Sequence, residues 1–215
     1  MTARPILVFG AGGHGKVVAD AARSAGFALA GFVDDAPSRA GSSIWGLPVI
    51  TWEQCRSEPG RWGSACFALG IGDNGARENV QCRLEDADRE VAVVVHGRAT
   101  ISPTARLAPG TVVMAGAVVN PDAVIGRGCI VNTGAIVEHD CELGEFVHLS
   151  PNVALGGTVW IGDRTHLGLG AVALPGVRIG TDVKVGAGAV VIRDVPDALT
   201  VVGVPAWPLE GRAKK

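Results

Sequence analysis

Residues 125–149 read IGRGCI VNTGAI VEHDCE LGEFVH L, so that an aliphatic residue begins each unit of six. Four residues after each of these comes a second, mostly small side chain, always alanine, cysteine, threonine or valine. The register continues without an insertion through sixteen units, which begin at Ile101, Leu107, Val113, Val119, Ile125, Val131, Val137, Leu143, Leu149, Leu155, Ile161, Leu167, Ala173, Ile179, Val185 and Val191. This part of the chain is therefore one continuous repeat.

The period of six residues decides the architecture. It matches neither the 3.6-residue turn of an α-helix nor the variable spacing of hairpins, but it fits one short strand followed by one corner. Three such units close a triangular coil of 18 residues, with the aliphatic residue pointing inward and the small residue filling the corner. Sixteen units stack about five coils at ~4.8 Å per step. The sequence predicts an all-β parallel β-helix over residues 99–215.

Length, charge and cysteine content narrow the class of protein. The chain has 215 residues and a formal net charge of −2, without a long run of either sign, which argues against nucleic acid or an anionic membrane as a partner. Its five cysteines form no CxxC pair and are expected to be reduced and buried. The apolar run at residues 6–9 is too short for a signal peptide or a membrane span. We expect a cytoplasmic protein of two domains.

The first 98 residues have the pattern of an α/β domain. A buried strand over residues 5–10 leads into the glycine turn GAGGHG and a helix over 16–25, and a second strand, 29–33, ends at Asp34 and Asp35. A third strand, 65–69, runs into GIGDN, followed by a helix over 76–87 and a short strand over 91–95. Glycines and a helix N-terminus suit phosphate binding. These residues hold little more than one βαβ unit, whereas an NAD site needs two mononucleotide-binding halves, so a nucleotide-linked sugar fits better than NAD. We therefore predict a Rossmann-like, sugar-nucleotide-binding domain over residues 1–98.

The turn GAGGHGKVV, the strand end FVDD, the turn GIGDN and the downstream repeat together resemble one family. These motifs are similar to those of the hexapeptide-repeat sugar-nucleotide acetyltransferases, which include bacillosamine and perosamine N-acetyltransferases and proteins related to sialic acid O-acetyltransferases. The resemblance implies a left-handed β-helix, acetyl-CoA as co-substrate, no metal, and a homotrimer with active sites between subunits. It also implies a role in the biosynthesis of glycans such as O-antigen.

The resemblance also implies a set of ligand contacts. The paired carboxylates at the second strand end are expected near the base or ribose, and the two glycine turns near the phosphates or sugar; the residues concerned are Gly12, Gly13, His14, Asp34, Asp35, Gly72, Asp73 and Asn74. For Asp34 and Asp35 a solvated strand-end turn is the alternative, and for His14 a helix-cap side chain. The contacts expected for coenzyme A are His148, Gly157, Gly170, Gly188, Gly203, Pro205 and Ala206.

The closing segment GVPA resembles the family's G-x-P-A motif, which lies against coenzyme A. In the family a lysine or arginine usually follows the alanine, whereas here Trp207 does. Arg212, Lys214 or Lys215 is a candidate replacement for the missing cation, with a merely solubilising tail as the alternative.

Acetyl transfer to an amine needs a base and a donor for the developing oxyanion. The stretch EHDC at residues 138–141 resembles the family's catalytic segment, in which the histidine is the general base, so His139 takes that role, with Glu138 or Asp140 orienting the ring. Eighteen residues later, one coil on, stands Gly157, whose backbone N–H is the expected oxyanion donor. His148 and His166 are also 18 apart and should stack on one outward face, with His148 contacting substrate or a neighbouring subunit.

The predicted activity is N-acetylation of a GDP- or UDP-linked 4-amino-4,6-dideoxysugar such as GDP-perosamine, by direct attack on acetyl-CoA. The sequence leaves the base, the sugar and the acetylated atom open, and we favour nitrogen. Alternatives are an O-acetyltransferase acting on a sialic-acid-type sugar, a zinc lyase resembling carbonic anhydrase, a nicotinamide-dependent oxidoreductase and a non-catalytic scaffold. The 9-residue and 18-residue histidine spacings do not resemble the zinc ligands of that lyase class.

Overall fold

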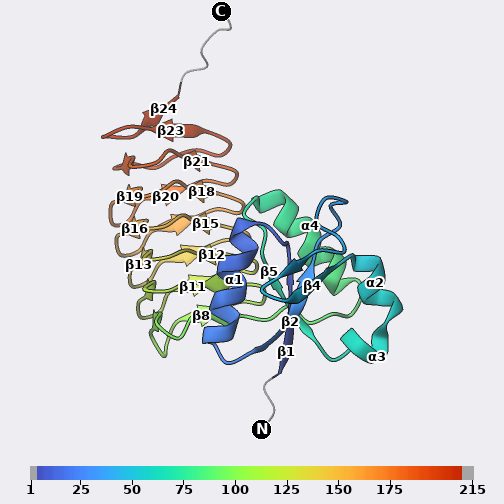
Figure 1. The fold of residues 1–215 in the computed structure, drawn as a ribbon. Coiled ribbons are helices and arrows are strands. Elements are labelled where there is room, and N and C mark those ends of the chain that lie inside the picture. Colours follow the sequence, from blue (N-terminus) through green and yellow to red (C-terminus); the bar gives the residue numbers. More distant parts are fainter. Residues whose placement is uncertain (1–3, 210–215) are drawn as a thin grey trace, which may run out of the picture.

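A computed structural model describes residues 4–209 of the chain as two packed parts, a small α/β domain and a three-sided prism of parallel strands (Figure 1). The α/β domain is built on one sheet of strand order β3-β4-β2-β1-β5. Its elements are β1 (Pro5–Phe9), α1 (Gly13–Ser24), β2 (Ala28–Val33), β3 (Ser43–Ile44), β4 (Leu47–Ile50), α2 (Trp52–Ser57), α3 (Pro59–Trp62), β5 (Cys66–Leu69) and α4 (Asn74–Glu85).

The three faces of the prism differ in the chemical character of their outward-pointing side chains. The face that lies against the α/β domain, here called the domain face, contains β6 (Val94–Val95), β9 (Val112–Val113), β12 (Ile130–Val131), β15 (His148–Leu149), β18 (His166–Leu167), β21 (Lys184–Val185), β23 (Thr200–Val202) and β24 (Trp207–Pro208).

The second face, here called the apolar face, contains β7 (Thr100–Ile101), β10 (Val118–Val119), β13 (Ile136–Val137), β16 (Ala154–Leu155), β19 (Val172–Ala173) and β22 (Val190–Val191). The third, here called the charged face, contains β8 (Arg106–Leu107), β11 (Val124–Ile125), β14 (Glu142–Leu143), β17 (Trp160–Ile161) and β20 (Arg178–Ile179). In almost every strand the second residue is buried in the prism and the first points out, as the repeat predicts.

The prism keeps the 18-residue register from β7 to β22, since Val118 pairs with Ile136 and Val172 with Val190. The last coil is shorter, because Ile179 bridges to Val195 rather than to a residue 18 positions on. The strand expected over residues 91–95 divides: Val91 bridges to Phe67 in the α/β sheet, whereas β6 pairs with β9 and forms the first rung of the domain face.

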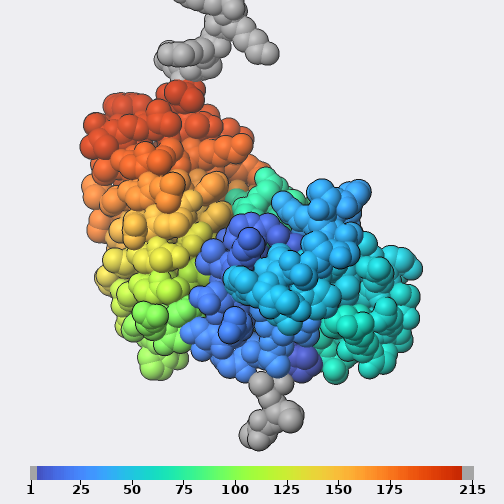
Figure 2. All heavy atoms as spheres, viewed as in Figure 1, coloured from blue at the N-terminus to red at the C-terminus, as the bar shows by residue number. Residues whose placement is uncertain are grey.

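A shared core joins the two parts. Val18 on α1 packs in one buried cluster with Val112, Met114 and Ile130 of the prism. The space-filling view shows the α/β domain covering the lower coils, while the upper coils stand clear of it in this view (Figure 2). The interface therefore fixes where the loops of the α/β domain meet the prism.

Candidate active site

His139 and Asp140 form an exposed pair at the corner between the apolar and charged faces. The imidazole Nδ1 lies 2.7 Å from Asp140 Oδ2, and both side chains are more than half exposed. This hydrogen bond is the main cause of the raised pKa of His139. Asp140 adopts a positive φ of 57°, a conformation that aspartate tolerates better than most residues. Nδ1–H donates to the carboxylate, so Nε2 carries the lone pair needed by a base.

Glu138 does not orient the ring. Its Oε2 instead accepts the backbone N–H of His139 at 3.2 Å. Of the two flanking acids, Asp140 is therefore the one that contacts the ring.

Gly157 lies directly against the imidazole in the next coil. A Cβ added to Gly157 would stand 2.6 Å from both Cε1 and Nε2 of His139, so only glycine permits this approach. Thr158 donates its N–H to the His139 carbonyl at 2.9 Å, which ties the two corners together. Among residues 4–209 no acceptor takes the Gly157 N–H. A base and a free amide donor therefore meet at one corner.

The glycine turn after β1 lines a cavity of about 360 Å³ together with Asp34, Arg39 and the turn after β5. Helix α1 begins at Gly13 without a side-chain cap and without an acid in its first turn, so its N-terminal N–H groups remain available for an anion. His14, in that first turn, also lines the cavity.

Asp34 and Asp35 point to different places. Asp34 is buried, and its carboxylate accepts the N–H of Ala11 and of Ala36 and pairs with Arg39 at 2.9 Å. Burial opposes ionisation of Asp34, but these three donors outweigh it and hold its pKa below the ordinary value. Asp35 accepts the Trp52 N–H at the start of α2 and pairs with an arginine of α4, outside the cavity.

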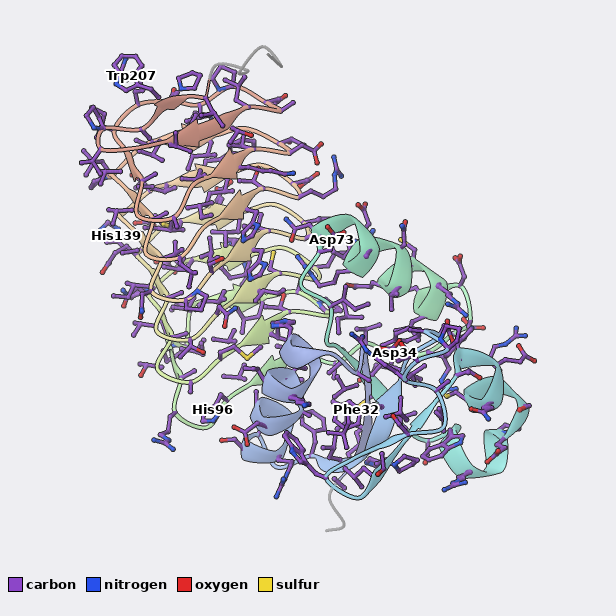
Figure 3. All side chains as sticks on the ribbon, turned by 45° about the horizontal axis from the view of Figure 1, so that its top comes forward. Phe32, Asp34, Asp73, His96, His139 and Trp207 are labelled. Carbon is purple, nitrogen blue, oxygen red and sulfur yellow. The ribbon has the colours of Figure 1, made fainter. Side chains whose placement is uncertain are left out.

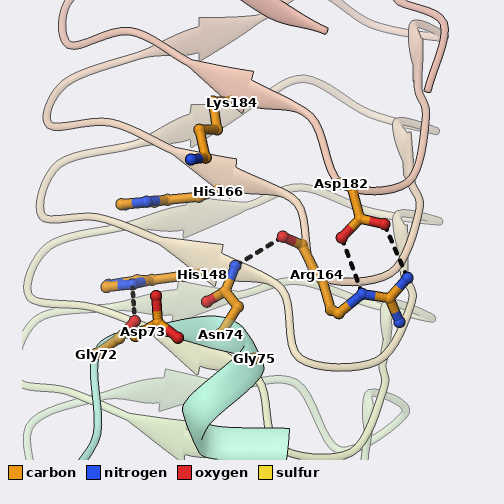
Figure 4. A pocket seen from close by; sticks show the side chains of 9 residues that line it. All are labelled: Gly72, Asp73, Asn74, Gly75, His148, Arg164, His166, Asp182 and Lys184. Atoms are coloured by element: carbon orange, nitrogen blue, oxygen red, sulfur yellow. Dashed lines mark hydrogen bonds and ion pairs between the residues drawn. The ribbon is translucent and has the colours of Figure 1, made fainter. Parts of the chain in front are cut away.

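A second cavity, of about 610 Å³, lies where the N-terminus of α4 meets the domain face (Figure 4). It is lined by Gly72, Asp73, Asn74, Gly75, His148, Arg164, His166, Asp182 and Lys184. Asp73 caps α4 by accepting the Ala76 N–H, and Asn74 donates to the Arg164 carbonyl at 2.8 Å. Gly72 also belongs to the first cavity, so the two are neighbours.

His148 and His166 stack as predicted, with ring centroids 4.5 Å apart and planes 6° from parallel. His148 is buried, however, because the α/β domain covers this part of the face. Its Nδ1 lies 3.2 Å from the Gly72 carbonyl and its Nε2 lies 3.3 Å from the Asn132 side-chain amide. Burial lowers the pKa of His148 to about 3, so the ring is neutral at physiological pH. Ser150 Oγ lies 2.8 Å from His166 Nε2.

His14 is the third imidazole of this region. Its ring centroid is 6.1 Å from that of His148, and its Nε2 is buried with no partner among the described residues. Burial lowers its pKa to about 4.

Arg77 is a buried arginine whose role no sequence motif indicates. It donates to the Gly128 and Phe146 carbonyls of the prism at 2.6 and 2.8 Å, and to the Ile71 and Gly72 carbonyls of the turn after β5. It therefore pins the turn that lines both cavities to the prism.

The glycines expected to contact coenzyme A lie toward the C-terminal end of the prism. Gly170 and Gly188 occupy positive-φ positions at the corner between the domain and apolar faces. Gly203, Pro205 and Ala206 follow β23; the Gly203 carbonyl accepts the Val190 N–H, and Ala206 donates to the Val190 carbonyl. The candidate cations Arg212, Lys214 and Lys215 lie outside the described residues.

One chain does not bring all these groups together. His139 lies at the corner opposite the domain face, whereas Asp34 and Asp73 lie in the α/β domain, on the other side of the prism (Figure 3). The described part of the chain contains no helix long and apolar enough to cross a membrane, and within residues 4–209 no group of three or more metal-ligating side chains occurs.

An α/β domain with a glycine turn, joined to a prism of six-residue units, defines a hexapeptide-repeat acyltransferase. Residues 5–84 match the PglD N-terminal domain family. A histidine-to-asparagine variant of perosamine N-acetyltransferase from Caulobacter crescentus, in complex with CoA and GDP-perosamine, is 40% identical over 96% of this chain and 97% of that chain, with a TM-score of 0.90. The acetyltransferase domain of PglB from Neisseria gonorrhoeae, in complex with acetyl coenzyme A, is 40% identical over 96% of this chain and all of that domain (100%), with a TM-score of 0.90.

The UDP-N-acetylbacillosamine N-acetyltransferase of Bacillus subtilis is 37% identical over 115 residues. That alignment covers 51% of each protein, so this chain matches about half the length of the curated relative. The chain belongs to the family of hexapeptide-repeat sugar-nucleotide acetyltransferases. The matches confirm the predicted fold class, a Rossmann-like domain followed by a left-handed β-helix, and the predicted family with its acetyl-CoA co-substrate.

Proposed function

We propose that this protein transfers the acetyl group of acetyl-CoA to the amino group of a nucleotide-linked 4-amino-4,6-dideoxysugar such as GDP-perosamine. The observation that carries the proposal is the His139 imidazole packed on the unpaired Gly157 amide. Relatives that bind CoA with GDP-perosamine, or that act on UDP-N-acetylbacillosamine by name, support this substrate class.

The chemistry follows from that corner. The sugar amine attacks the thioester carbon while His139 Nε2 takes a proton from the nitrogen, and the carbonyl oxygen receives the Gly157 N–H as its charge develops. The tetrahedral intermediate then collapses, the C–S bond breaks, and the thiolate of coenzyme A leaves and takes up a proton. Asp140 stabilises the imidazolium between these steps. A general base of this kind contributes about 100- to 10,000-fold to the rate.

We propose direct transfer without an acyl-enzyme. Cys141 is the nearest thiol in sequence, but it points into the prism, donates to the Gly156 carbonyl, and has its pKa raised by burial. A buried protonated thiol is a poor nucleophile.

We propose that the nucleotide binds in the cavity beside the glycine turn. The free N–H groups at the start of α1 suit its diphosphate, and Arg39 adds a half-exposed cation above Gly12. Because Asp34 already accepts two backbone amides and Arg39, we assign it to holding this turn and Arg39 in place, in addition to its expected position near the base or ribose.

A homotrimer with active sites between subunits would unite the separated groups. The apolar face supports it, because its outward residues Val118, Ile136, Ala154 and Val172 form a continuous aliphatic strip that includes the exposed Ile136. Packing between prisms would bring the His139 corner of one subunit toward the cavities of the next. Light scattering tests the trimer. If Asn74, which lines the cavity against the domain face, contacts the sugar nucleotide as expected, a co-expressed mixture of His139→Ala and Asn74→Ala chains should be more active than either variant alone.

The reaction is tested by measuring free coenzyme A released from acetyl-CoA with a panel of GDP- and UDP-linked amino sugars, alongside the same sugars bearing hydroxyl in place of the amine. We expect release with at least one amino sugar, and a 100- to 10,000-fold loss in His139→Ala. Full activity of that variant would remove the proposed base, and release with only the hydroxyl sugars would replace N-acetylation by O-acetylation.

A further inference from the structure

Arg77 on α4 is a completely buried cation, which is rare for an arginine without a paired carboxylate. Its guanidinium donates to five oxygen atoms, namely the backbone carbonyls of Ile71, Gly72, Gly128 and Phe146 and the side-chain Oδ1 of Asn74. This number equals the number of N–H groups on a guanidinium. Arg77 therefore has no donor left for a ligand, and any role in binding has to be exerted at a distance.

No carboxylate neutralises this charge. Arg77 forms no ion pair within the described range 4–209, whereas Arg127 of the prism pairs with two glutamates. The charge of Asp73 counteracts the effect of burial on the pKa of Arg77, but its carboxylate accepts the Ala76 N–H and not the guanidinium. Burial lowers that pKa only to about 10, so Arg77 is protonated at neutral pH. The junction between the α/β domain and the prism thus holds an uncompensated positive charge away from water.

The positive potential of Arg77 extends into both cavities, as three imidazoles show. His14 lines the first cavity, and His148 and His166 line the second. Burial is the main cause of the lowered pKa of each imidazole, and the Arg77 charge lowers the pKa of all three further. A charge that disfavours a proton at these positions favours an anion there, because both effects have the same electrostatic origin.

We propose that Arg77 supplies the counter-charge for the diphosphate of the sugar nucleotide without touching it. This inference rests on the proposed function, which puts that diphosphate in the cavity at the start of α1. Ile71 and Gly72 line this cavity, and their carbonyls accept the Arg77 N–H groups, so the guanidinium lies one backbone turn away from it. A buried cation without a counter-ion destabilises the empty protein, and an anion bound close by offsets that effect.

Arg39, the other cation near this cavity, contributes in a different way. It is half-exposed, so water and salt screen its charge, and Asp34 compensates that charge at 2.9 Å. Arg77 is screened by neither, because burial excludes water and no carboxylate among the described residues is paired with it. Arg39 is therefore suited to contacting a phosphate directly, whereas Arg77 sets the electrostatic potential of the cavity.

The test is calorimetric binding of GDP and of UDP to the full chain and to two variants of Arg77. Arg77→Met removes the charge but keeps an unbranched side chain, and we expect it to weaken binding of the nucleoside diphosphate about tenfold. Arg77→Lys keeps the charge but has too few N–H donors for all the acceptors, and we expect its affinity to stay within about threefold of that of the parent protein. If Arg77 were only a structural link, both variants would lose affinity together.

Arg127 provides a matched control. It also joins α4 to the prism, through Glu85 and Glu145, but these two carboxylates compensate its charge. Arg127→Met should therefore unfold at a lower urea concentration than the parent protein, yet bind GDP or UDP equally well. In kinetics, Arg77→Met should raise the KM for the sugar nucleotide far more than the KM for acetyl-CoA.

The inference is overturned if Arg77→Met binds the nucleoside diphosphate as tightly as the parent protein, or if Arg77→Lys or Arg127→Met loses as much affinity as Arg77→Met. Should Arg77→Met fail to fold, Arg77→Lys decides: affinity within about threefold of the parent protein supports the inference, and a larger loss overturns it. A parent protein that binds neither GDP nor UDP contradicts the proposed function itself. The two failures are therefore distinguishable in one set of titrations.

Discussion

Because His139 lies so close to Gly157, adding a single methyl group at Gly157 tests whether the position of the imidazole controls the reaction rate. In Gly157→Ala the new Cβ would stand 2.6 Å from two ring atoms, whereas ordinary contacts between such atoms lie at 3.4–4 Å. The prism backbone is fixed by hydrogen bonds on both sides of the corner, so the ring has to move rather than the backbone.

The size of the effect follows from that displacement. The imidazole must retreat by roughly 1 Å, and a misplacement of this size costs about 100-fold in rate, equivalent to ~2.7 kcal/mol of barrier. Stability should change little, because the ring is exposed and can swing into solvent. We therefore expect kcat to fall about 100-fold while the melting temperature stays within about 2 °C.

The assay is acetyl-CoA turnover at saturating sugar nucleotide, with thermal unfolding measured on the same samples. Gly60→Ala is the matched control: Gly60 has no positive φ, and an added Cβ there meets nothing within 4 Å. Activity of Gly157→Ala within threefold of the parent protein would refute the reasoning, and so would an equal loss in Gly60→Ala.

Three further predictions follow from the same contacts. Asp140→Asn should lower the pKa of His139, because the carboxylate is what raises it, so the acid limb of the kcat/KM profile should move to lower pH in a pH titration of activity. The free energy of unfolding should decrease as pH falls below 6.5, by ~1.4 kcal/mol per pH unit for each histidine whose pKa is lowered in the folded chain. The cause is that these histidines, His14 and His148, take up protons below pH 6.5 in the unfolded chain but only near pH 3 to 4 in the folded chain. In urea titrations at several pH values, the free energy of unfolding of His148→Gln should depend less steeply on pH than that of the parent protein. Arg77→Ala should cost about 3 kcal/mol of stability, because several buried carbonyls lose their donor, whereas Arg106→Ala on the charged face should cost little.

The prism was predictable because its information is local and repeated. Each of the sixteen units has its aliphatic residue at the same position, so only a period of six residues fits the sequence. The stacking of His148 on His166 and the approach of Gly157 to His139 follow from the 18-residue coil alone. The shortened final coil was not predictable, since Val195 still satisfies the periodic pattern.

The α/β domain was only partly predictable. Residues 43–62 hold two short strands and two short helices, none longer than six residues, which are too brief for a periodic pattern to emerge. The motif alone does not distinguish the paired carboxylates after β2, but successive side chains of an extended chain point to opposite sides. Asp34 accordingly faces the glycine turn, and Asp35 does not.

The contacts between the α/β domain and the prism could not be predicted from the sequence. Arg77 reaches carbonyls 51 and 69 positions away in the chain, and no spacing rule indicates such partners. The burial of His148 has the same origin, because it depends on which face of the prism the α/β domain covers. These are properties of docking between two units whose individual folds the sequence does predict.

The fixed 18-residue coil has a consequence for how such proteins diversify. An insertion of one residue within a strand would exchange its inward and outward side chains, whereas an inserted block of a whole coil would leave each residue on its own face. Such a block changes only the height separating two corners, and it changes that height in whole steps of ~4.8 Å. The number of coils in this architecture therefore sets the separation of two corners in steps of one coil.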